Sequence, residues 1–369
     1  MSRRICIVLT GLQAGGTERV VNVLANEWVP RGWAVTVVTF EPASAAPYYR
    51  FHPSVEIRNL ALPPSRQSAL WAVLATARRV RHLRRAFQDI RPDIVFSFLT
   101  RTNVTSLIAA SGLGMKVVVS ERNNSALQDV GYIWNWMRAR LYPRAFGLVT
   151  MTRESLALFP AGTFRRSWVI ANAVELPTDG ERRRGANILT AVGRLVPQKG
   201  FDMLLRAFAE ISADFPEWRL VIWGEGEERA ALEAERSRLG LDCRVEFPGV
   251  TPRPGAWVET ADVFVLSSRF EGWGIVLLEA MAADLPVVSF DCDFGPREMI
   301  EDQKNGLLVA PNDVSALAKA LARVLGDEHL RARLGQAAGT TARQFTPRRM
   351  VDQWDAVAYE ALDHSPHSR

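Results

Sequence analysis

Residues 262–281 read DVFVLSSRFEGWGIVLLEAM, and this stretch decides the fold. An apolar run at residues 263–266 ends in two serines and a glycine-containing turn, and a second apolar run begins at Ile275. The first run predicts a strand of a parallel sheet, because such strands are buried on both faces. The second run is apolar on every side of a helical projection, so we expect a buried helix.

The same alternation of short apolar runs and helix-length segments extends through the rest of the chain. Most runs end in a polar or glycine-containing turn before a helical pattern, which is the order of a doubly wound α/β fold. Around the opening stretch, runs lie at residues 188–193, 219–224, 244–247 and 286–290. Before residue 172, they lie at residues 4–10, 33–40, 55–60, 93–99, 116–120, 147–152 and 168–171.

The alternation breaks at NAVELPTDGERRRGAN, residues 172–187. Proline, glycine and a run of charges are typical of a linker. We therefore predict two Rossmann-like domains, each with a doubly wound parallel sheet, that face an interdomain cleft. The predicted boundaries are 1–172 for the N-terminal domain, 173–187 for the linker, 188–345 for the C-terminal domain and 346–369 for a final helix.

Composition excludes several other classes of protein. The 369 residues are 48% apolar and 23% charged, unlike a disordered, collagen-like or coiled-coil chain. The three cysteines are far apart, which predicts no disulfide framework and fits a cytoplasmic protein. The first apolar run fails by Gln13, and no run approaches the roughly 18 residues of a membrane span, so we expect neither a signal peptide nor a transmembrane helix.

Positive charge is concentrated in the first half of the chain. Residues 1–175 contain 22 Lys and Arg against 10 Asp and Glu, a net charge of +12, and residues 176–369 contain 23 against 30, a net charge of −7. The run RRVRHLRR at residues 78–85 lies on an amphipathic helical pattern, which is typical of a membrane-surface element. A solvated helix face is the alternative. Nucleic acid is disfavoured, because no aromatic-rich basic platform accompanies the run.

Two turns are placed to meet an anion. GLQAGGTE at residues 11–18 and GRLVPQKG at residues 193–200 each join a strand to a helix. Backbone N–H groups and the helix dipole attract phosphate at such turns. In the second turn, Arg194 and Lys199 predict a diphosphate clamp. The alternatives are a plain tight turn for the first and two solvated cations for the second.

The opening stretch carries the strongest signal of a site. Glu271 lies in the turn after the strand, and Glu279 is a lone carboxylate on a helix that we expect to be buried. A buried charge requires hydrogen-bond partners, which sugar or ribose hydroxyls would supply. Free N–H groups at residues 274–276 would face a phosphate. A structural Glu paired with an Arg is the alternative.

The tripeptide DCD at residues 291–293 copies the Asp-x-Asp motif of metal-dependent transferases. There the motif binds a divalent cation that bridges the diphosphate. Because Arg194 and Lys199 already supply positive charge, we predict no metal and assign the tripeptide to a turn.

Together these motifs resemble the retaining GT-B glycosyltransferases of family 4, over nearly the whole chain and most specifically from Gly193 to Asp313. The segments SRFEGWGIVLLEAMA and SFDCDFGPREMI most resemble the bacterial branch that builds exopolysaccharides and lipid-linked oligosaccharides, including amylovoran-type and N-glycan precursor transferases. The matching segments are Gly15-Gly16, Gly193-Arg194, Lys199-Gly200, Gly224-Glu225-Gly226, Glu271 and Glu279 with seven residues between them, GPREMI at 295–300 and NGLLV at 305–309.

The resemblance implies a role for each matching residue. Arg194, Lys199 and Glu271 are the catalytic candidates: the two cations would hold the donor diphosphate, and Glu271 would contact the transferred sugar. Glu279 would bind the ribose. The remaining donor-binding candidates are Gly15, Gly16, Gly193, Gly224, Glu225, Gly274, Ile275 and Val276.

One departure concerns the acceptor side. Many relatives carry a His after the fifth strand of the first domain, whereas this chain reads SERNN at residues 120–124. Glu121 and Arg122 are therefore only candidates for that role.

The resemblance implies a metal-independent hexosyl- or N-acetylhexosaminyltransferase that needs no cofactor beyond its nucleotide-sugar substrate, with a UDP-sugar more expected than a GDP-sugar. The C-terminal domain would bind this donor. The N-terminal, acceptor-side domain would meet a lipid-linked saccharide on the inner face of the cell membrane, where the protein would lie as a peripheral cytoplasmic enzyme. The final helix would cross back to the N-terminal domain. A sugar-nucleotide epimerase of the same fold and a non-catalytic assembly subunit are the alternatives.

Overall fold

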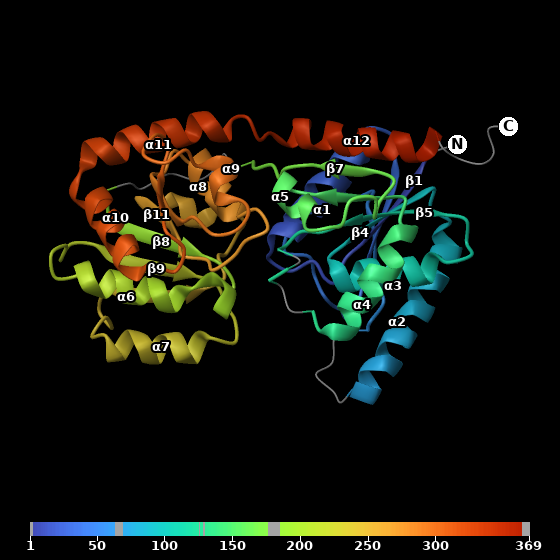
Figure 1. Cartoon of the computed structure of the whole chain (residues 1–369), viewed down its shortest axis with the longest axis horizontal. Coiled ribbons are helices and arrows are strands. Elements are labelled where there is room, and N and C mark those ends of the chain that lie inside the picture. The colour runs from blue at the N-terminus through green and yellow to red at the C-terminus, as the bar shows by residue number, and fades with distance from the viewer. Residues whose placement is uncertain (1–2, 63–68, 125, 128–129, 176–184, 364–369) are drawn as a thin grey trace. The chain divides into compact units, whose positions relative to one another are not determined.

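The computed structural model describes residues 3–62, 69–124, 126–127, 130–175 and 185–363 (Figure 1). The chain divides into two compact units. Unit 1 comprises residues 1–171 and 348–369, and unit 2 comprises residues 172–347. Most of the predicted linker, residues 176–184, lies outside the described residues.

Unit 1 is built on a seven-stranded parallel sheet in the order β3-β2-β1-β4-β5-β6-β7. The central strand β4 reads IVFSF and is buried at every position, which explains its unbroken apolar character. The strands are β1 (Arg4–Val8), β2 (Ala34–Thr39), β3 (Glu56–Asn59), β4 (Ile94–Phe98), β5 (Lys116–Ser120), β6 (Gly147–Thr150) and β7 (Ser167–Val169).

The helices of unit 1 cover its sheet. Helix α3 packs against both α2 and α4, and residues of all three helices join one hydrophobic cluster with the sheet. The elements are α1 (Gly16–Trp28), α2 (Ala69–Ile90), α3 (Thr100–Ala110), α4 (Tyr132–Leu141), the 3-10 turn η1 (Tyr142–Arg144), α5 (Arg153–Ala157) and α12 (Pro347–Asp363).

Helix α12 is part of the core of unit 1, although it comes last in the chain. The Trp354 ring meets Phe96 of β4 edge-on with centroids 5.3 Å apart, and Trp28 of α1 stacks on the same ring at 5.2 Å. The Trp28 indole N–H donates to Asp355 of α12 at 2.7 Å. Buried aromatic contacts of this kind make α12 a structural element rather than a loose tail.

Unit 2 has a six-stranded parallel sheet in the order β10-β9-β8-β11-β12-β13. Helix α6 packs against α10, and α8 packs against α11; the two pairs lie on opposite sides of the sheet (Figure 1). The strands are β8 (Ile188–Val192), β9 (Arg219–Trp223), β10 (Val245–Gly249), β11 (Val263–Leu266), β12 (Val287–Phe290) and β13 (Leu307–Val309). The helical elements are η2 (Pro197–Lys199), α6 (Phe201–Ile211), α7 (Arg229–Arg238), η3 (Ala256–Glu259), α8 (Ile275–Ala282), α9 (Pro296–Met299), α10 (Val314–Gly326) and α11 (Glu328–Ala342).

The prediction of two parallel-sheet α/β domains is confirmed. Among the described helices, none combines the length and apolar character that a bilayer crossing requires.

Candidate functional site

Most predicted site residues of unit 2 follow three neighbouring strands, β9, β8 and β11. Arg194 comes shortly after β8, Glu225 after β9 and Glu271 after β11. The carboxyl ends of parallel strands meet at one edge of a sheet, which is where doubly wound folds bind ligands. We call the segments 193–200, 224–226 and 267–279 the strand-end site.

The ends of β8 and β9 approach so closely that only glycine fits. Gly224 has φ +143°, and a Cβ added there would lie 1.8 Å from the Gly193 carbonyl oxygen. Any other residue at position 224 would force the two strand ends apart. The glycines therefore set the shape of this edge.

Lys199 and Glu271, predicted separately, form an ion pair. Lys199 Nζ lies 2.6 Å from Glu271 Oε1, and the two side chains are only 14% and 7% exposed. The Ser268 hydroxyl donates to the same carboxylate oxygen at 2.6 Å. Within the described chain, Glu271 is the only side chain that accepts a hydrogen bond from Lys199, so two of its three N–H donors remain for a ligand.

The backbone around Lys199 holds its side chain against the end of β8. A Cβ added at Gly193 would lie 3.1 Å from Lys199 Cε. The Ser267 hydroxyl donates to the Lys199 carbonyl at 2.9 Å. Gly200 has φ +62°, and a Cβ there would meet the Ser267 carbonyl at 2.1 Å. The Lys199 ammonium group is therefore held in place by close packing that Gly193 and Gly200 permit.

Arg194 differs from Lys199 in being exposed. No hydrogen bond or ion pair joins its side chain to another described residue, so its guanidinium is available to an anion. Glu225, in contrast, is exposed and pairs with Arg229 at 2.5 Å. Its side chain is thus committed within unit 2.

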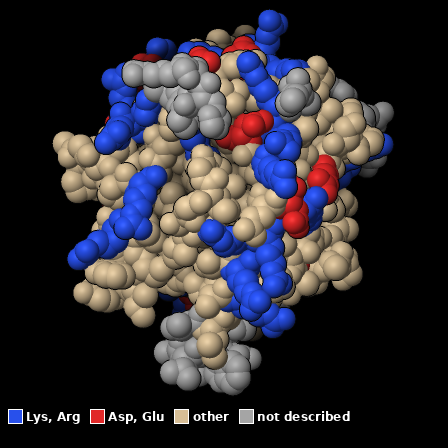
Figure 2. Space-filling view, turned by 90° about the vertical axis from the view of Figure 1, so that its right-hand side faces the viewer, with Lys and Arg blue, Asp and Glu red and all other residues tan. Residues whose placement is uncertain are grey.

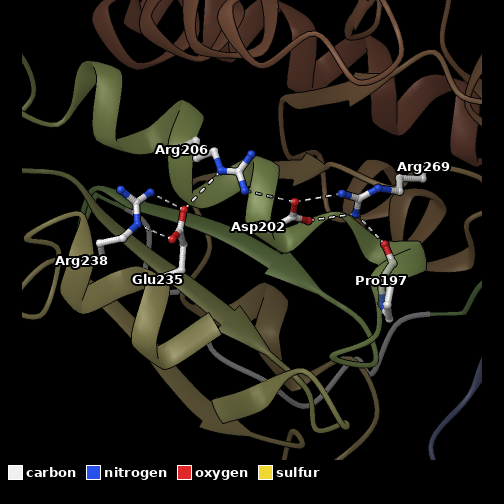
Figure 3. A network of polar contacts seen from close by, with 6 residues as sticks. All are labelled: Pro197, Asp202, Arg206, Glu235, Arg238 and Arg269. Carbon is white, nitrogen blue, oxygen red and sulfur yellow. Dashed lines mark hydrogen bonds and ion pairs between the residues drawn. The ribbon is translucent and has the colours of Figure 1, made fainter. Parts of the chain in front are cut away.

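A second network links the turn of Lys199 to the loop of Glu271 (Figure 3). Arg269 donates to both carboxylate oxygens of Asp202 at 2.9 Å, and also to the Pro197 carbonyl at 2.6 Å. The backbone N–H of Arg269 donates to the Gln198 carbonyl at 2.8 Å. These contacts clamp the turn that precedes α6 to the segment that follows β11.

The network of ion pairs around Asp202 continues across the surface of unit 2. Arg206 lies 3.9 Å from Asp202 and 3.2 Å from Glu235, which also pairs with Arg238 (Figure 3). Burial alone would raise the pKa of Asp202, but its hydrogen bonds and charge contact with Arg269 hold that pKa below its ordinary value. The hydrogen bond from Arg238 lowers the pKa of Glu235 to about 2.

Sequence reasoning missed Asp202 and Arg269. Arg269 stands two residues before Glu271, and Asp202 lies in the first turn after Lys199, so both were adjacent to the motifs. Their pairing across 67 residues leaves no periodic signal in the sequence.

Helix α8 is not buried on every side, which corrects the expectation from its apolar sequence. Leu277, Leu278, Ala280 and Met281 are buried. Ile275, Val276 and Glu279 are half-buried and share one face of the helix. The helix begins after Gly274, at φ +82°, and no side chain caps its first N–H groups. These groups are available to an anion.

Glu279 has a protein partner. The Trp257 indole N–H donates to Glu279 Oε2 at 3.3 Å. The helix start and Glu271 are close, because a Cβ added at Gly274 would lie 3.9 Å from Glu271 Cγ. Thus the cation, the two carboxylates and the helix N-terminus belong to one region of unit 2.

The glycine turn of unit 1 is lined by carboxylates. A Cβ added at Gly15 would lie 2.2 Å from Glu18 Oε2, and Gly16 begins α1. Glu41 accepts a hydrogen bond from the Leu12 backbone N–H at 2.8 Å. In this form the turn offers an anion two nearby negative charges, which disfavours binding until they move.

Glu121 lies in the interior of unit 1. The Thr100 hydroxyl is 3.0 Å from both carboxylate oxygens, and the Tyr142 hydroxyl also donates to this carboxylate. Asn103 bonds in turn to the Tyr142 hydroxyl at 2.9 Å. Burial raises the pKa of Glu121. Glu121 therefore joins β5, α3 and η1, a role that the sequence did not indicate.

Arg122 is also buried. Its guanidinium carbon lies 5.9 Å from the centre of the Phe98 ring, a cation–π arrangement. Burial lowers the pKa of Arg122 to about 9.

The Asp-x-Asp tripeptide is engaged by a cation of the protein. Arg297 Nε donates to Asp291 at 2.8 Å, and a second guanidinium nitrogen contacts the other oxygen. The Asp293 carbonyl accepts from the Glu271 backbone N–H at 3.3 Å. In the described parts of the chain, no group of three or more His, Cys, Asp or Glu side chains is placed to hold a metal ion.

Comparisons with known proteins agree with this architecture. Residues 15–173 match the family model described as a glycosyl transferase 4-like domain, and residues 175–341 match glycosyl transferases group 1.

Two curated bacterial proteins are similar over nearly their full lengths. One, from Campylobacter jejuni, is 27% identical over 95% of this chain and 97% of its own; it is named GalNAc-alpha-(1->4)-GalNAc-alpha-(1->3)-diNAcBac-PP-undecaprenol alpha-1,4-N-acetyl-D-galactosaminyltransferase. The other is the amylovoran biosynthesis glycosyltransferase AmsD of Erwinia amylovora, 24% identical over 96% of this chain and 99% of its own.

Among solved structures, Anabaena Alr3699/HepE in complex with UDP and glucose superposes with a TM-score of 0.77 at 20% identity, covering 96% of this chain and 99% of that one.

Proposed function

Because this chain belongs to the glycosyltransferases with a GT-B fold, we propose that it transfers a hexosyl or N-acetylhexosaminyl unit from a UDP-sugar to a lipid-linked saccharide, with retention of anomeric configuration. One relative is named for transfer of N-acetyl-D-galactosamine to a saccharide on PP-undecaprenol, and another is named for amylovoran biosynthesis. Residues 15–173 and 175–341 carry the family match, so both units of the fold are included.

One observation carries the proposal. The nearly buried Lys199–Glu271 pair lies beside the uncapped start of α8, and the exposed Arg194 lies at the same edge of the sheet. A sugar nucleotide presents a diphosphate next to a ring with hydroxyls. Positive charge and free N–H groups can bind the diphosphate, and a carboxylate can bind the ring hydroxyls.

The chemistry that follows is electrostatic. When the bond between the anomeric carbon and the phosphate oxygen breaks, negative charge grows on the leaving diphosphate and positive charge grows on the sugar. Arg194, Lys199 and the first N–H groups of α8 would stabilise the negative charge on the diphosphate. The Glu271 carboxylate, held by Ser268, would stay beside the positive charge on the sugar. No metal is needed for this division of charge.

The choice of UDP and of a lipid-linked acceptor is supported by the relatives. The Anabaena structure is titled as a complex with UDP and glucose, and the Campylobacter enzyme is named for an undecaprenol diphosphate acceptor. We propose the same classes of substrate for this chain.

A lipid-linked acceptor places the reaction at a membrane, and we propose that unit 1 meets its cytoplasmic surface. Arg78, Arg81 and Arg85 of α2 are exposed. Figure 2 shows basic side chains over one face of the molecule, with acidic ones gathered in part of it. Anionic lipid attracts such a face at low salt.

The test is a turnover assay with UDP-glucose, UDP-N-acetylglucosamine and UDP-N-acetylgalactosamine in EDTA. We expect UDP release that depends on an added undecaprenyl diphosphate-linked saccharide. Conversion of a UDP-sugar to its isomer without acceptor would instead identify an epimerase.

A further inference from the structure

Helix α4 of unit 1 presents an apolar face to solvent. Tyr132, Ile133 and Trp136 are 85%, 64% and 54% exposed, whereas most large apolar side chains of the described chain are buried. Isolated exposed apolar residues are common, but three on one ten-residue helix form a patch that needs a partner.

Helical geometry separates this outer face from an inner one. Trp134, Met137 and Leu141 are spaced at i, i+3 and i+7 and pack on the hydrophobic cluster of unit 1. Tyr132 and Trp136 are spaced at i and i+4, on the opposite side. The core thus already holds α4 through its inner face, and the outer face is not required for folding.

Charge identifies the partner. From residue 131 to residue 146 the sequence has three arginines, Arg138, Arg140 and Arg144, and no Asp or Glu. Arg140 is exposed, and its guanidinium carbon lies 5.5 Å from the centre of the Trp136 ring. Aromatic rings flanked by arginine are typical of the boundary between lipid headgroups and acyl chains, whereas like charges disfavour a second copy of this face.

The basic helix α2 lies on the same side of unit 1. Residues of α2 and α4 pack on the same hydrophobic cluster, and α3 contacts both helices. The exposed arginines of α2 would therefore face anionic headgroups when α4 meets the bilayer.

We infer that the outer face of α4, formed by Tyr132, Ile133, Trp136 and Arg140, inserts into the interfacial layer of an anionic lipid membrane. The exposed arginines of α2 add long-range attraction, and α4 supplies the apolar contact. The inference rests on the proposed function only for its purpose, which is to bring the enzyme to a lipid-linked acceptor.

The experiment measures co-sedimentation of the full chain with phosphatidylcholine vesicles that do or do not contain phosphatidylglycerol. We expect the double variant Ile133→Ser/Trp136→Ser to bind anionic vesicles about tenfold more weakly at every salt concentration, because apolar contact is lost. The triple variant Arg78→Gln/Arg81→Gln/Arg85→Gln should lose mainly the salt-sensitive part. Val250→Ser is the matched control, since Val250 is 46% exposed on unit 2 and should not affect binding.

Insertion has its own signature. Quenching of tryptophan fluorescence by brominated lipid should fall in Trp136→Phe, although Trp136→Phe should still bind vesicles. Unchanged quenching, or double-variant binding equal to wild type, would overturn the inference. So would a wild-type dimer that the double variant converts to monomer, because the face would then join two copies.

The proposed function is read out separately through the rise in melting temperature with UDP. A double variant that keeps this rise and loses vesicle binding supports the inference. A wild-type protein that binds UDP but not anionic vesicles refutes the inference and the proposed membrane contact of unit 1, and leaves the proposed transfer from a UDP-sugar intact. A wild-type protein that binds the vesicles but not UDP refutes the proposed function alone.

Discussion

Replacing Lys199 by Ala should damage both the stability and the activity of the enzyme. The lost ammonium lies 2.6 Å from a carboxylate that is only 7% exposed. Removing one member of a nearly buried pair leaves the other charge uncompensated, which costs about 3 kcal/mol of unfolding free energy. Loss of one preorganised donor to the leaving diphosphate should lower kcat by about two to three orders of magnitude.

A second variant separates the two effects. In Lys199→Ala/Glu271→Gln the orphaned charge is gone, so we expect most of the lost stability to return while kcat stays low. Lys304→Ala is the matched control: Lys304 pairs with Glu301 at 2.8 Å, but both side chains are 68% exposed. Breaking that pair should cost less than about 1 kcal/mol and leave kcat unchanged.

The assays are urea unfolding and UDP release with saturating donor and acceptor. Charge grows on the diphosphate as the bond breaks, so the loss should appear in kcat as well as in donor KM. A Lys199→Ala protein with wild-type kcat and donor KM would refute the diphosphate clamp and leave Lys199 a purely structural cation.

Two further predictions concern unit 2. Asp202→Asn should release Arg269 and raise donor KM with a smaller change in kcat. The pKa of Asp202 in the folded protein lies below its ordinary value of 3.8, so the stability deficit of the variant should be full at pH 7, begin to shrink near pH 3.8 and disappear once the pH falls below the folded-state pKa; urea midpoints that keep a constant difference from pH 7 to pH 3 would contradict this. Asp291→Asn/Asp293→Asn should keep most activity in EDTA, because Asp291 pairs with Arg297; a loss in EDTA that manganese restores would show a metal site instead.

The fold could be predicted because its strands are short, apolar runs that carry a local signal. β4 reads IVFSF and is buried throughout, and β11 reads VFVL with the same burial. Continuous burial on both faces is what a parallel sheet imposes on sequence. The helix α8 misled this reasoning, since an all-apolar sequence does not say which face a neighbour covers.

The site could be predicted only in part, because motifs are local and contacts are not. Glycine positions and lone charges indicated Lys199 and Glu271, and the family resemblance assigned both to one donor site, yet nothing in the sequence showed that they pair directly across 72 residues. The buried network of Glu121 and Tyr142 and the exposed face of α4 depend in the same way on packing between distant segments.

Nucleotide-dependent thermal stability tests the central claim most directly, since the strand-end site is assigned to a diphosphate. In EDTA, UDP should raise the melting temperature more than UMP does, because only UDP presents the second phosphate to Arg194 and Lys199. Arg194→Ala should reduce the UDP shift to the level of UMP. Equal shifts with UDP and UMP in the wild type, or an Arg194→Ala protein that responds to UDP as the wild type does, would contradict the account.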